Sequence, residues 1–423
     1  MTDPDLAPEV ALAAGLFDAL RAASLDLPGV TRASFGPGEA AAHALVAEAA
    51  RHAGLEASCD AVGTLRMVLP GRDRNLPAVA IGSHLDSVPH GGNFDGAAGV
   101  IMGLAAAAHR ARRGLQGARD LLVLGIRAEE MCWFPAHYLG SRAALGLLPR
   151  DAPDTLRRAD TGRTLADHMA EQGLDPAPIR TGQATLGREQ IAAFLEPHIE
   201  QGPALVAAGL PVAVVTGIRG SLRYPRATVL GEYAHAGAVP RAHRRDAALA
   251  AVALIAALDA RWQRLEEEGA DLVVTAGILA TDPAHHAPTK IPGHLSFSLD
   301  IRSEDAGLLA ETDSWLHEEA ARLEAARGVR FDFGPATHAA PARMDPGLRA
   351  VLREAASRAG VPVREMASGA GHDCATFAGL GIPSAMLFLR NAHGSHNPEE
   401  AMEMADFAAG LAVLSGALEA LLA

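Results

Sequence analysis

The sequence predicts an α/β protein that is interrupted by a smaller α+β domain. Residues 78–81 and 121–124 are wholly apolar, as is typical of central strands in a sheet that helices cover on both faces. Each of these strands precedes a segment with helical periodicity, so strands and helices alternate. Between residues 212 and 334 the order changes to β-β-α-β-β-α-β, and residues 295–301 alternate apolar and polar side chains. This change predicts an inserted, open-faced sheet with two helices on one side.

The change of pattern sets the predicted domain boundaries. Residues 1–211 form the first part of the α/β domain, and residues 335–423 form its second part. Residues 212–334 form the inserted domain. A chain of 423 residues is long enough for two domains, and 49% hydrophobic residues can fill both cores.

The elements of the α/β domain follow from periodicity and from turn residues. Two Ala-rich helices occupy the first fifty residues, and the second begins at Pro37, a residue favoured in the first turn of a helix. The remaining elements are strands at 65–69, 78–81 and 121–124, helices at 96–113 and 141–148, and, after the insertion, a helix at 346–360, a strand at 384–389 and a helix from 401 to the end.

The inserted domain contains two long helices. The apolar side chains of residues 245–268 recur at three- and four-residue steps, for example Leu254, Leu258 and Leu265, which predicts a helix with one buried face. The other predicted elements are strands at 212–218, 222–231, 272–279, 295–301 and 329–333 and a helix at 304–326.

Composition excludes several classes of protein. The formal net charge of −13 argues against a protein that binds the phosphate backbone of nucleic acid. Three cysteines, Cys59, Cys132 and Cys374, are too few for a disulfide framework. The acidic N-terminus lacks the pattern of a signal peptide, and no window reaches the roughly 18 uncharged apolar residues of a membrane span. We therefore expect a soluble, cytoplasmic protein with no nucleic-acid or membrane partner.

The densest polar signal is the segment 82–96, which follows a predicted buried strand and ends where a helix begins. Open α/β sheets bind ligands at this place, beyond the carboxyl ends of their strands. His84 and Asp86 alternate to one face of the strand end, and glycines flank Asp95. We expect His84 to bind a metal ion, Asp86 to hold the other imidazole nitrogen, and Asp95 to be a further ligand.

Three further clusters follow apolar segments. Glu129 and Glu130 are adjacent, so one carboxylate can bind a metal while the other faces the water that the metal activates. His198 lies between a proline and a Gly-Pro pair, and His396 follows the strand at 384–389. Nitrogen and carboxylate ligands without thiolates suit Zn²⁺, Mn²⁺ or Co²⁺, and a carboxylate shared by two ions is typical of two-metal sites. The predicted metal ligands are His84, Asp95, Glu130, His198 and His396.

Taken together, the motifs resemble those of the amidase, hydantoinase/carbamoylase family, a branch of the zinc aminoacylase/carboxypeptidase-type hydrolases. The resemblance extends from about Gly63 to Met404, and the motifs occur in family order. They are GSHLDS, GGNFDG, EE, HIEQGP, HAG, RRDA, DIR, SGAGHD and SHNP.

The resemblance implies a mixed-sheet, zinc-peptidase-like catalytic domain with an inserted ferredoxin-like lid that also forms a homodimer interface. It implies that His84, Asp95 and His198 hold one divalent ion, and that Asp95, Glu130 and His396 hold the other. Glu129 matches the general base of the family, and Asp86 matches the carboxylate behind the first histidine. The residues expected to contact a ureido or amide substrate with a carboxylate are Gln201, His235, Arg302, Gly369 and Thr289.

Two of these substrate residues have plain alternatives. His235 could donate a hydrogen bond to the developing oxyanion, or it could be an ordinary surface histidine. Arg302 could grip a carboxylate with its planar fork, or it could pair with Asp300 or Glu304.

The chain departs from the family pattern at three places, one of which is Arg219, where a small apolar residue is usual. Met131, Cys132 and Trp133 follow Glu130 where the family commonly has Gly-Ser-Arg, and Thr289 and Lys290 stand where an asparagine commonly precedes the Ile-Pro-Gly turn. These positions concern the substrate, so they leave the reaction class unchanged.

The predicted function is hydrolysis of an N-carbamoyl-L-amino acid to the amino acid, CO₂ and ammonia by a dimetal enzyme. The alternatives are an allantoate or ureidoglycolate amidohydrolase, a β-ureidopropionase, and an N-acyl amino acid aminoacylase or dipeptidase. A catalytically inactive binding protein is the rival from a different class, and it predicts no bound metal.

Overall fold

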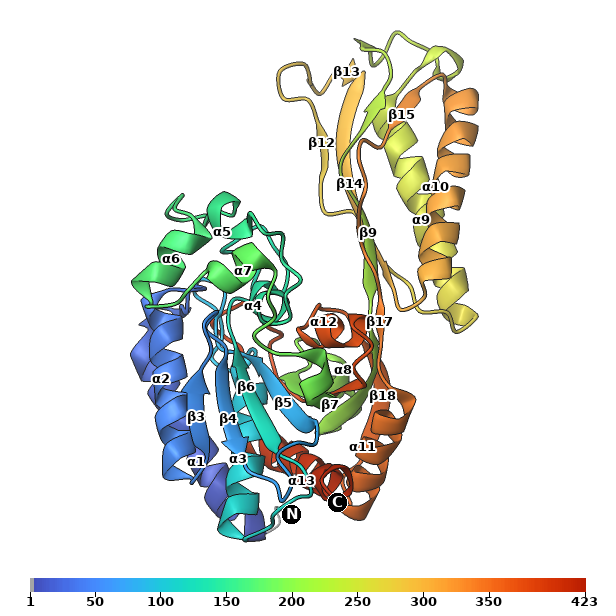
Figure 1. Cartoon of the computed structure of the whole chain (residues 1–423). Coiled ribbons are helices and arrows are strands. Elements are labelled where there is room, and N and C mark those ends of the chain that lie inside the picture. Colours follow the sequence, from blue (N-terminus) through green and yellow to red (C-terminus); the bar gives the residue numbers. More distant parts are fainter. Residues whose placement is uncertain (1–3) are drawn as a thin grey trace. The chain divides into compact units, whose positions relative to one another are not determined.

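The computed structural model describes residues 4–423, which form two compact units (Figure 1). Unit 1 runs to Thr216 and resumes at Met344, and unit 2 spans Gly217–Arg343. The strand Val212–Ile218 (β8) was expected in the inserted domain, but it pairs with a strand of the large sheet of unit 1. Six of its seven residues are buried, as its apolar sequence requires of a strand inside a covered sheet.

Unit 1 is built on a mixed sheet of nine strands, whose edge strand β17 is formed by the last two residues before the chain re-enters unit 1. The order of the strands is β17-β8-β19-β7-β5-β6-β4-β3, and β18 also pairs with β8. The four central strands, β19, β7, β5 and β6, run parallel, whereas β4 and β8 pair antiparallel at either side of them. The strands are β3 (Glu56–Cys59), β4 (Leu65–Leu69), β5 (Ala78–His84), β6 (Leu121–Ile126), β7 (Ile191–Ile199), β8 (Val212–Ile218), β17 (Ala342–Arg343), β18 (Val363–Ser368) and β19 (Ser384–Leu389).

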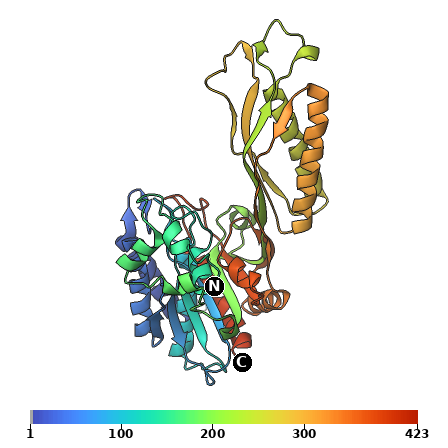
Figure 2. The ribbon, with the colours of Figure 1, turned by 45° about the horizontal axis from the view of Figure 1, so that its top comes forward.

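Five long helices pack against this sheet (Figures 1 and 2). They are α1 (Ala7–Ser24), α2 (Pro37–His52), α3 (Ala97–Arg112), α11 (Pro346–Arg358) and α13 (Met404–Leu421). Their buried faces share one apolar core with the strands, which includes Leu20, Val46, Ile81, Ile101 and Leu414. Helix α13 has the length and hydropathy of a membrane span, but half of it is buried inside the protein.

Short elements complete unit 1. They are the helices α4 (Leu139–Ala144), α5 (Ala152–Thr155), α6 (Leu165–Glu171), α7 (Ala177–Thr181), α8 (Ala204–Ala208) and α12 (Cys374–Gly379), the 3₁₀ helices Pro4–Leu6 and Arg188–Gln190, and the strand pair β1 (Leu25–Asp26) and β2 (Gly29–Val30). The three cysteines are free thiols.

Unit 2 pairs one antiparallel sheet with two long helices, α9 (Ala247–Glu267) and α10 (Ala306–Arg327). Strand β14 alternates half-buried and buried residues, so one face of the sheet covers a core that includes Leu254, Phe297 and Leu316. The predicted strand at 272–279 is two short strands, β11 and β12, and both pair with β14. The strands are β9 (Gly220–Leu230), β11 (Val273–Thr275), β12 (Leu279–Thr281), β14 (His294–Ser303), β15 (Arg330–Asp332) and β16 (Thr337–Ala339), with β10 (Ala234–His235) and β13 (Lys290–Ile291) as a separate pair and a 3₁₀ helix at Arg241–His243.

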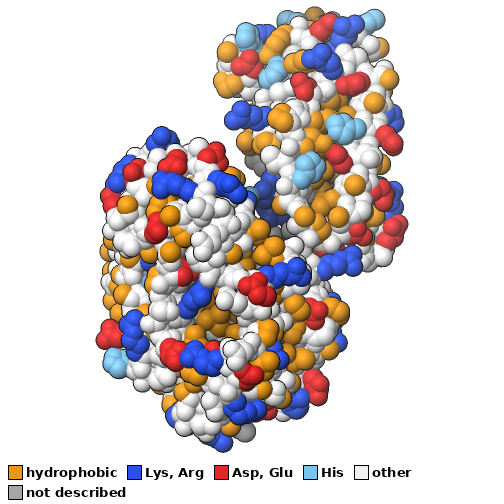
Figure 3. Space-filling model, viewed as in Figure 1, with side chains coloured by type: hydrophobic (Ala, Val, Ile, Leu, Met, Phe, Trp, Pro, Cys, Tyr) orange, Lys and Arg blue, Asp and Glu red, His pale blue; other side chains and the backbone are white. Residues whose placement is uncertain are grey.

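The charged side chains form no continuous basic patch on the face shown in Figure 3, where basic and acidic side chains are interspersed. This distribution agrees with the net charge of −13.

Candidate metal centre

Four parallel strands of unit 1 deliver polar side chains to one edge of the sheet. His84 ends β5, and His198 lies one residue before the end of β7. Glu129 and Glu130 follow β6, and His396 follows β19. Because the carboxyl ends of parallel strands meet at the same edge, residues far apart in sequence converge there.

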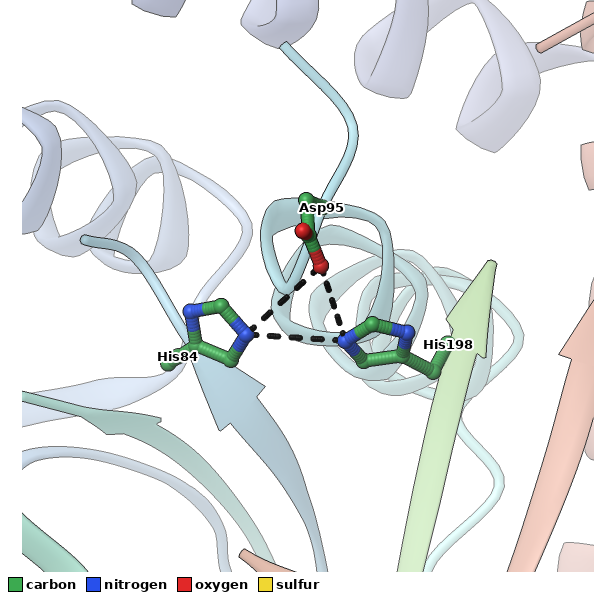
Figure 4. A group of neighbouring side chains, drawn as sticks. All are labelled: His84, Asp95 and His198. Carbon is green, nitrogen blue, oxygen red and sulfur yellow. Dashed lines mark hydrogen bonds and ion pairs between the residues drawn. The ribbon is translucent and has the colours of Figure 1, made fainter. Parts of the chain in front are cut away.

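The first candidate ligand group is His84, Asp95 and His198 (Figure 4). All three side chains are buried, and their ligand atoms lie within 4.8 Å of one another. Oδ1 of Asp95 is 3.2 Å from Nε2 of His198 and 3.8 Å from Nε2 of His84. The two Nε2 atoms are 3.5 Å apart. Two imidazoles and a carboxylate thus face a common point.

The second group is Asp95, Glu130 and His396. Nε2 of His396 lies 3.2 Å from Oδ2 of Asp95 and 3.4 Å from Oε1 of Glu130. The side chain of His396 is 52% exposed, so this group opens to solvent while the first is closed. Asp95 therefore presents Oδ1 to one group and Oδ2 to the other.

The protonation pattern of the histidines fits a bound cation. Nδ1 of His198 faces the carbonyl oxygen of Ile199 at 2.9 Å, and Nδ1 of His84 faces Asp86. When Nδ1 carries the proton, the lone pair of Nε2 points toward the common point. Oδ1 of Asp95 is buried and has no hydrogen-bond partner. Several acceptor atoms that face one another in a buried site repel unless a cation lies among them, so the residues present fit a metal site.

The carboxylate of Asp86 connects the first histidine with the two glutamates. Its Oδ1 lies 3.3 Å from Nδ1 of His84 and accepts from the backbone N–H of Glu129 at 3.1 Å. Its Oδ2 accepts from the backbone N–H of Glu130 and from the hydroxyl of Ser34. Burial alone would lower the pKa of His84, but its hydrogen bond to Asp86 and the surrounding carboxylates hold that pKa well above its usual value, so these surroundings favour a positive charge at the site, either a proton on His84 or a metal ion in its place.

Glu129 has the electrostatic surroundings of an acid–base residue. Burial raises its pKa well above the usual value, and the charges of Glu130, Asp373 and Asp86 raise it further. A carboxylate with a raised pKa can take a proton near neutral pH and release it again. Glu130 also has a raised pKa because of burial, although the hydrogen bond from His396 opposes the shift.

Gln201 lies beside the two ligand groups. Its Nε2 donates to Oδ2 of Asp95 at 3.0 Å, and its backbone N–H donates to Oδ1 of Asn391 at 2.9 Å. Its φ of +62° is a left-handed conformation, which is uncommon for a residue other than glycine and sets the direction of the side chain. Gln201 therefore contacts the carboxylate that the two ligand groups share.

Gly369 is exposed, but its loop contacts the first ligand group through the buried residues Ser368 and His372. The hydroxyl of Ser368 donates to the carbonyl of Ala370 and contacts Nε2 of His372 at 2.9 Å. The ring of His372 packs edge-on against the ring of His198, with centroids 4.3 Å apart. These contacts fix the loop beside a predicted metal ligand.

The other predicted substrate residues belong to unit 2. His235 is exposed in β10, and its Nδ1 accepts from the backbone N–H groups of Gly237 and Ala238, both at 3.1 Å. This arrangement leaves the proton on Nε2, so the outer ring nitrogen is a donor. Thr289 is exposed, and its carbonyl oxygen accepts from the backbone N–H of Ala236.

Arg302 lies near the end of β14 and takes part in an ion pair. Its Nε and Nη2 donate to the two oxygens of Asp300, each at 2.9 Å. Asp300 also accepts from Nε of Arg223 at 2.9 Å. The pairing with Asp300 that the sequence left open as an alternative is therefore present.

Trp133, which stands where the family pattern commonly has arginine, is buried. Its indole N–H donates to the carbonyl of Ser87 at 2.7 Å, and the guanidinium of Arg158 lies 5.9 Å from the centre of its ring. The residue thus braces the loop that follows β5.

Further buried charged residues lie behind the ligands, and none of them was among the predicted site residues. Arg32 and Glu400 are both buried and bond to the loop between β5 and α3. Glu39 accepts from the backbone N–H of Ala128 and from Arg127, just before the two glutamates. Glu400 lies in the same polar string as His396, which could have identified it; Arg32 and Glu39 carry no comparable signal.

Comparison with known proteins agrees with this geometry. The model of peptidase family M20/M25/M40 matches residues 80–420. The chain is 33% identical over 400 residues to an N-carbamoyl-L-amino-acid amidohydrolase of Paenarthrobacter aurescens, covering 94% of each protein. It is 32% identical over 367 residues to the allantoate amidohydrolase of Escherichia coli, covering 86% of this chain and 85% of the relative.

A solved structure of an amidase of the hydantoinase/carbamoylase family from Burkholderia multivorans superposes with a TM-score of 0.87 at 28% identity, covering 98% of each chain. The family model and the relatives each extend over nearly all of the sheet and the ligand groups. The chain therefore belongs to peptidase family M20/M25/M40, within its hydantoinase/carbamoylase amidases.

Proposed function

We propose that this protein is a dimetal amidohydrolase that cleaves the linear ureido C–N bond of an N-carbamoyl-L-amino acid, releasing the amino acid, CO₂ and ammonia. One observation carries the proposal: Asp95 directs Oδ1 to His84 and His198, and Oδ2 to His396. A carboxylate placed in this way is suited to bridging two ions. The relatives named above, which act on N-carbamoyl amino acids and on allantoate, support the same reaction class.

The proposed ligands are His84, Asp95 and His198 for one ion, and Asp95, Glu130 and His396 for the other. Zn²⁺, Mn²⁺ and Co²⁺ all suit these nitrogen and oxygen donors. When bound, two such ions lower the pKa of a water molecule and polarise the substrate carbonyl.

Glu129 is the proposed general base. Its carboxylate accepts a proton from the attacking water and, because its pKa is raised, holds that proton until the leaving nitrogen takes it. Asp86 fixes the backbone N–H groups of Glu129 and Glu130, and it holds Nδ1 of His84. It therefore positions both the base and the ligands.

The proposed substrate contacts are Gln201 and Gly369 in unit 1, and His235, Thr289 and Arg302 in unit 2. The Nε2–H of His235 would donate to the carbonyl oxygen that gains negative charge. The guanidinium of Arg302 would bind the substrate carboxylate in place of, or together with, Asp300. In this proposal unit 2 acts as a lid, and its closure excludes water from the reaction.

We also propose that the enzyme is cytoplasmic and forms a homodimer through unit 2. Helix α9 and strand β12 of this unit carry half-exposed apolar side chains, among them Val252 and Leu279. They border a groove of about 400 Å³ that Trp262 also lines. Apolar area of this kind on a soluble protein is typical of a contact surface.

The test is a substrate panel. Purified protein loaded with Mn²⁺ or Zn²⁺ is incubated with N-carbamoyl-L-amino acids, their D-enantiomers, allantoate, ureidoglycolate, β-ureidopropionate and N-acyl amino acids, and ammonia and free amino acid are measured. Release of ammonia from N-carbamoyl-L-amino acids supports the proposal. Release of amino acid from N-acyl substrates alone would assign an aminoacylase, and turnover of no substrate by metal-loaded protein would favour a binding protein.

A further inference from the structure

The loop between β5 and α3 carries much of the metal centre but has little regular structure. His84 precedes the loop, and Asp86 and Asp95 lie within it. Its one β-bridge joins Gly91 to Val30. A loop cannot hold Asp95 within a few tenths of an ångström of its required place unless other contacts fix it.

Arg32 donates hydrogen bonds to oxygen atoms of this loop. The residue is fully buried, yet none of its hydrogen bonds goes to a carboxylate among the described residues. Its Nε donates to the carbonyl of Leu85 at 2.7 Å, and its two terminal nitrogens donate to the side-chain and backbone oxygens of Asn93 at 3.2 and 3.4 Å. One guanidinium thus joins the beginning of the loop to its end.

Glu400 accepts hydrogen bonds from backbone N–H groups of the same loop. Its Oε1 accepts from the backbone N–H groups of Phe94 and Asp95 at 2.8 and 3.2 Å, and its Oε2 contacts the hydroxyl of Ser395 at 2.5 Å. A Cβ at Gly92 would lie 2.2 Å from the carboxyl carbon of Glu400, so a glycine is required there for the carboxylate to enter.

Both charges are costly to bury. Burial lowers the pKa of Arg32, and the nearby carboxylates, Glu400 first among them, oppose that shift. Burial raises the pKa of Glu400 to about 7. A buried cation and a buried carboxylate that ligate nothing themselves need a compensating role. Apart from a 3.5 Å contact between Nη1 of Arg32 and the hydroxyl of Ser24, their side-chain hydrogen bonds lead to the segments that carry the ligands.

We propose that Arg32 and Glu400 are a pair of positioning residues. Arg32 binds oxygen atoms of the loop and Glu400 binds its backbone N–H groups, and together they fix Asp95 against His84 before any cation binds. This inference rests on the proposed function, because the loop matters to catalysis only if it carries the proposed metal ligands. The loop itself can be studied in metal-free protein.

The experiment measures amide hydrogen exchange in the full-length, metal-free chain and the affinity for Co²⁺ by titration of its visible absorption. The variants are Arg32→Met, Glu400→Ala and Glu400→Gln, and Gln keeps an oxygen for the two backbone donors. Arg110→Met is the matched control, because Arg110 is another buried arginine of unit 1 and lies near the far end of α3 from the loop. Exchange is read only at amides that do not bond to the altered side chain.

We expect Arg32→Met to speed exchange at Phe94 and Asp95 at least tenfold, and Glu400→Ala to do the same at Ser87 and Gly91. Both variants weaken Co²⁺ binding at least tenfold, whereas Glu400→Gln and Arg110→Met stay within threefold of wild type. Unchanged exchange and Co²⁺ affinity in folded Arg32→Met and Glu400→Ala would overturn the inference, as would an equal effect of Arg110→Met.

If Arg32→Met does not fold, Asn93→Ala removes one acceptor of Arg32 and leaves the cation in place. It should change exchange at Phe94 and Asp95 in the same direction, and no change there contradicts the inference. Failure of the wild-type enzyme on every substrate would contradict the proposed function and leave the exchange result intact.

Discussion

Nε2 of His198 lies 3.2 Å from Oδ1 of Asp95, while Oδ2 of the same carboxylate lies 3.2 Å from Nε2 of His396. One side chain therefore belongs to both ligand groups. Loss of this carboxylate should affect both ions, whereas loss of a histidine should affect one.

The first prediction compares Asp95→Ala with His198→Ala. We expect Asp95→Ala to retain less than one ion per chain and His198→Ala to retain about one, because Asp95, Glu130 and His396 remain. Elemental analysis after dialysis against micromolar Zn²⁺ measures both. The control is His52→Ala, an exposed histidine at the end of α2, which should bind metal like wild type. Equal metal content in all variants would contradict the two-group assignment.

The second prediction concerns Glu129. Glu129→Gln should keep its metal content, because Glu130 rather than Glu129 is in the ligand group, but kcat should fall about 10²–10⁴-fold because the proton acceptor is lost. Steady-state ammonia release and elemental analysis of the same sample check both parts. A variant that loses metal together with activity would instead make Glu129 a ligand.

The third prediction concerns Asp86, which holds Nδ1 of His84 and two backbone N–H groups. Asp86→Asn should weaken metal binding about 10–100-fold, as expected when a carboxylate behind a ligating imidazole is lost. Competition with a chelator measures the affinity. Ser34→Ala removes one donor to Asp86 and leaves the carboxylate, so it should have a smaller effect in the same direction. An unchanged dissociation constant for the metal in Asp86→Asn would show that His84 does not need the carboxylate of Asp86 in order to bind metal.

Much of the fold could be predicted because the pattern of apolar residues in a segment reflects which of its side chains are buried. The wholly apolar segments became the buried strands β5, β6 and β19, and the alternating segment became β14. Strand β8 was assigned to the wrong unit because an apolar strand does not reveal which sheet it joins. Strands such as β3 and β18 were missed because half-exposed strands lack a clear period.

The convergence of the two candidate ligand groups could be predicted for a related reason. A polar side chain that can bind a metal is easy to recognise at the end of an apolar strand, as His84 is at the end of β5. The supporting residues could not be predicted, because Arg32 lies 55 residues from Ser87 and 61 from Asn93, and only tertiary packing shows that they meet. Arg302 illustrates a different difficulty. Its partner Asp300 is only two residues away, yet the sequence could not show whether Arg302 pairs with Asp300 or binds a substrate.

The fourth prediction concerns the pH dependence of stability. Burial and the neighbouring Glu196 raise the pKa of Asp373 from 3.8 to about 8, and Oδ2 of Asp373 has no hydrogen-bond partner. The folded state therefore binds this proton more tightly than the unfolded state, so stability is lost as the pH rises from about 4 to about 8.

Asp373→Asn removes that loss. We expect the metal-free variant to be more stable than wild type at pH 9 by about 1–3 kcal/mol, and the difference to shrink toward pH 5. Urea denaturation at both pH values measures it. Asp18→Asn, an exposed change in α1, serves as the control and should follow wild type. If the difference between variant and wild type is the same at both pH values, Asp373 does not titrate in this range.

The last prediction concerns Arg302, whose Nε and Nη2 bind the two oxygens of Asp300. The side chain is 32% exposed, so it can also reach a ligand. If Arg302 binds the substrate carboxylate, Arg302→Lys should raise KM about tenfold to a hundredfold with a smaller effect on kcat, since a lysine cannot form the paired bonds of the guanidinium. Arg223→Lys is the matched control, because Arg223 donates to the same carboxylate through a single nitrogen, and it should leave KM within threefold of wild type. Equal KM values in the two variants, with thermal unfolding shifted alike, would reduce Arg302 to a structural partner of Asp300.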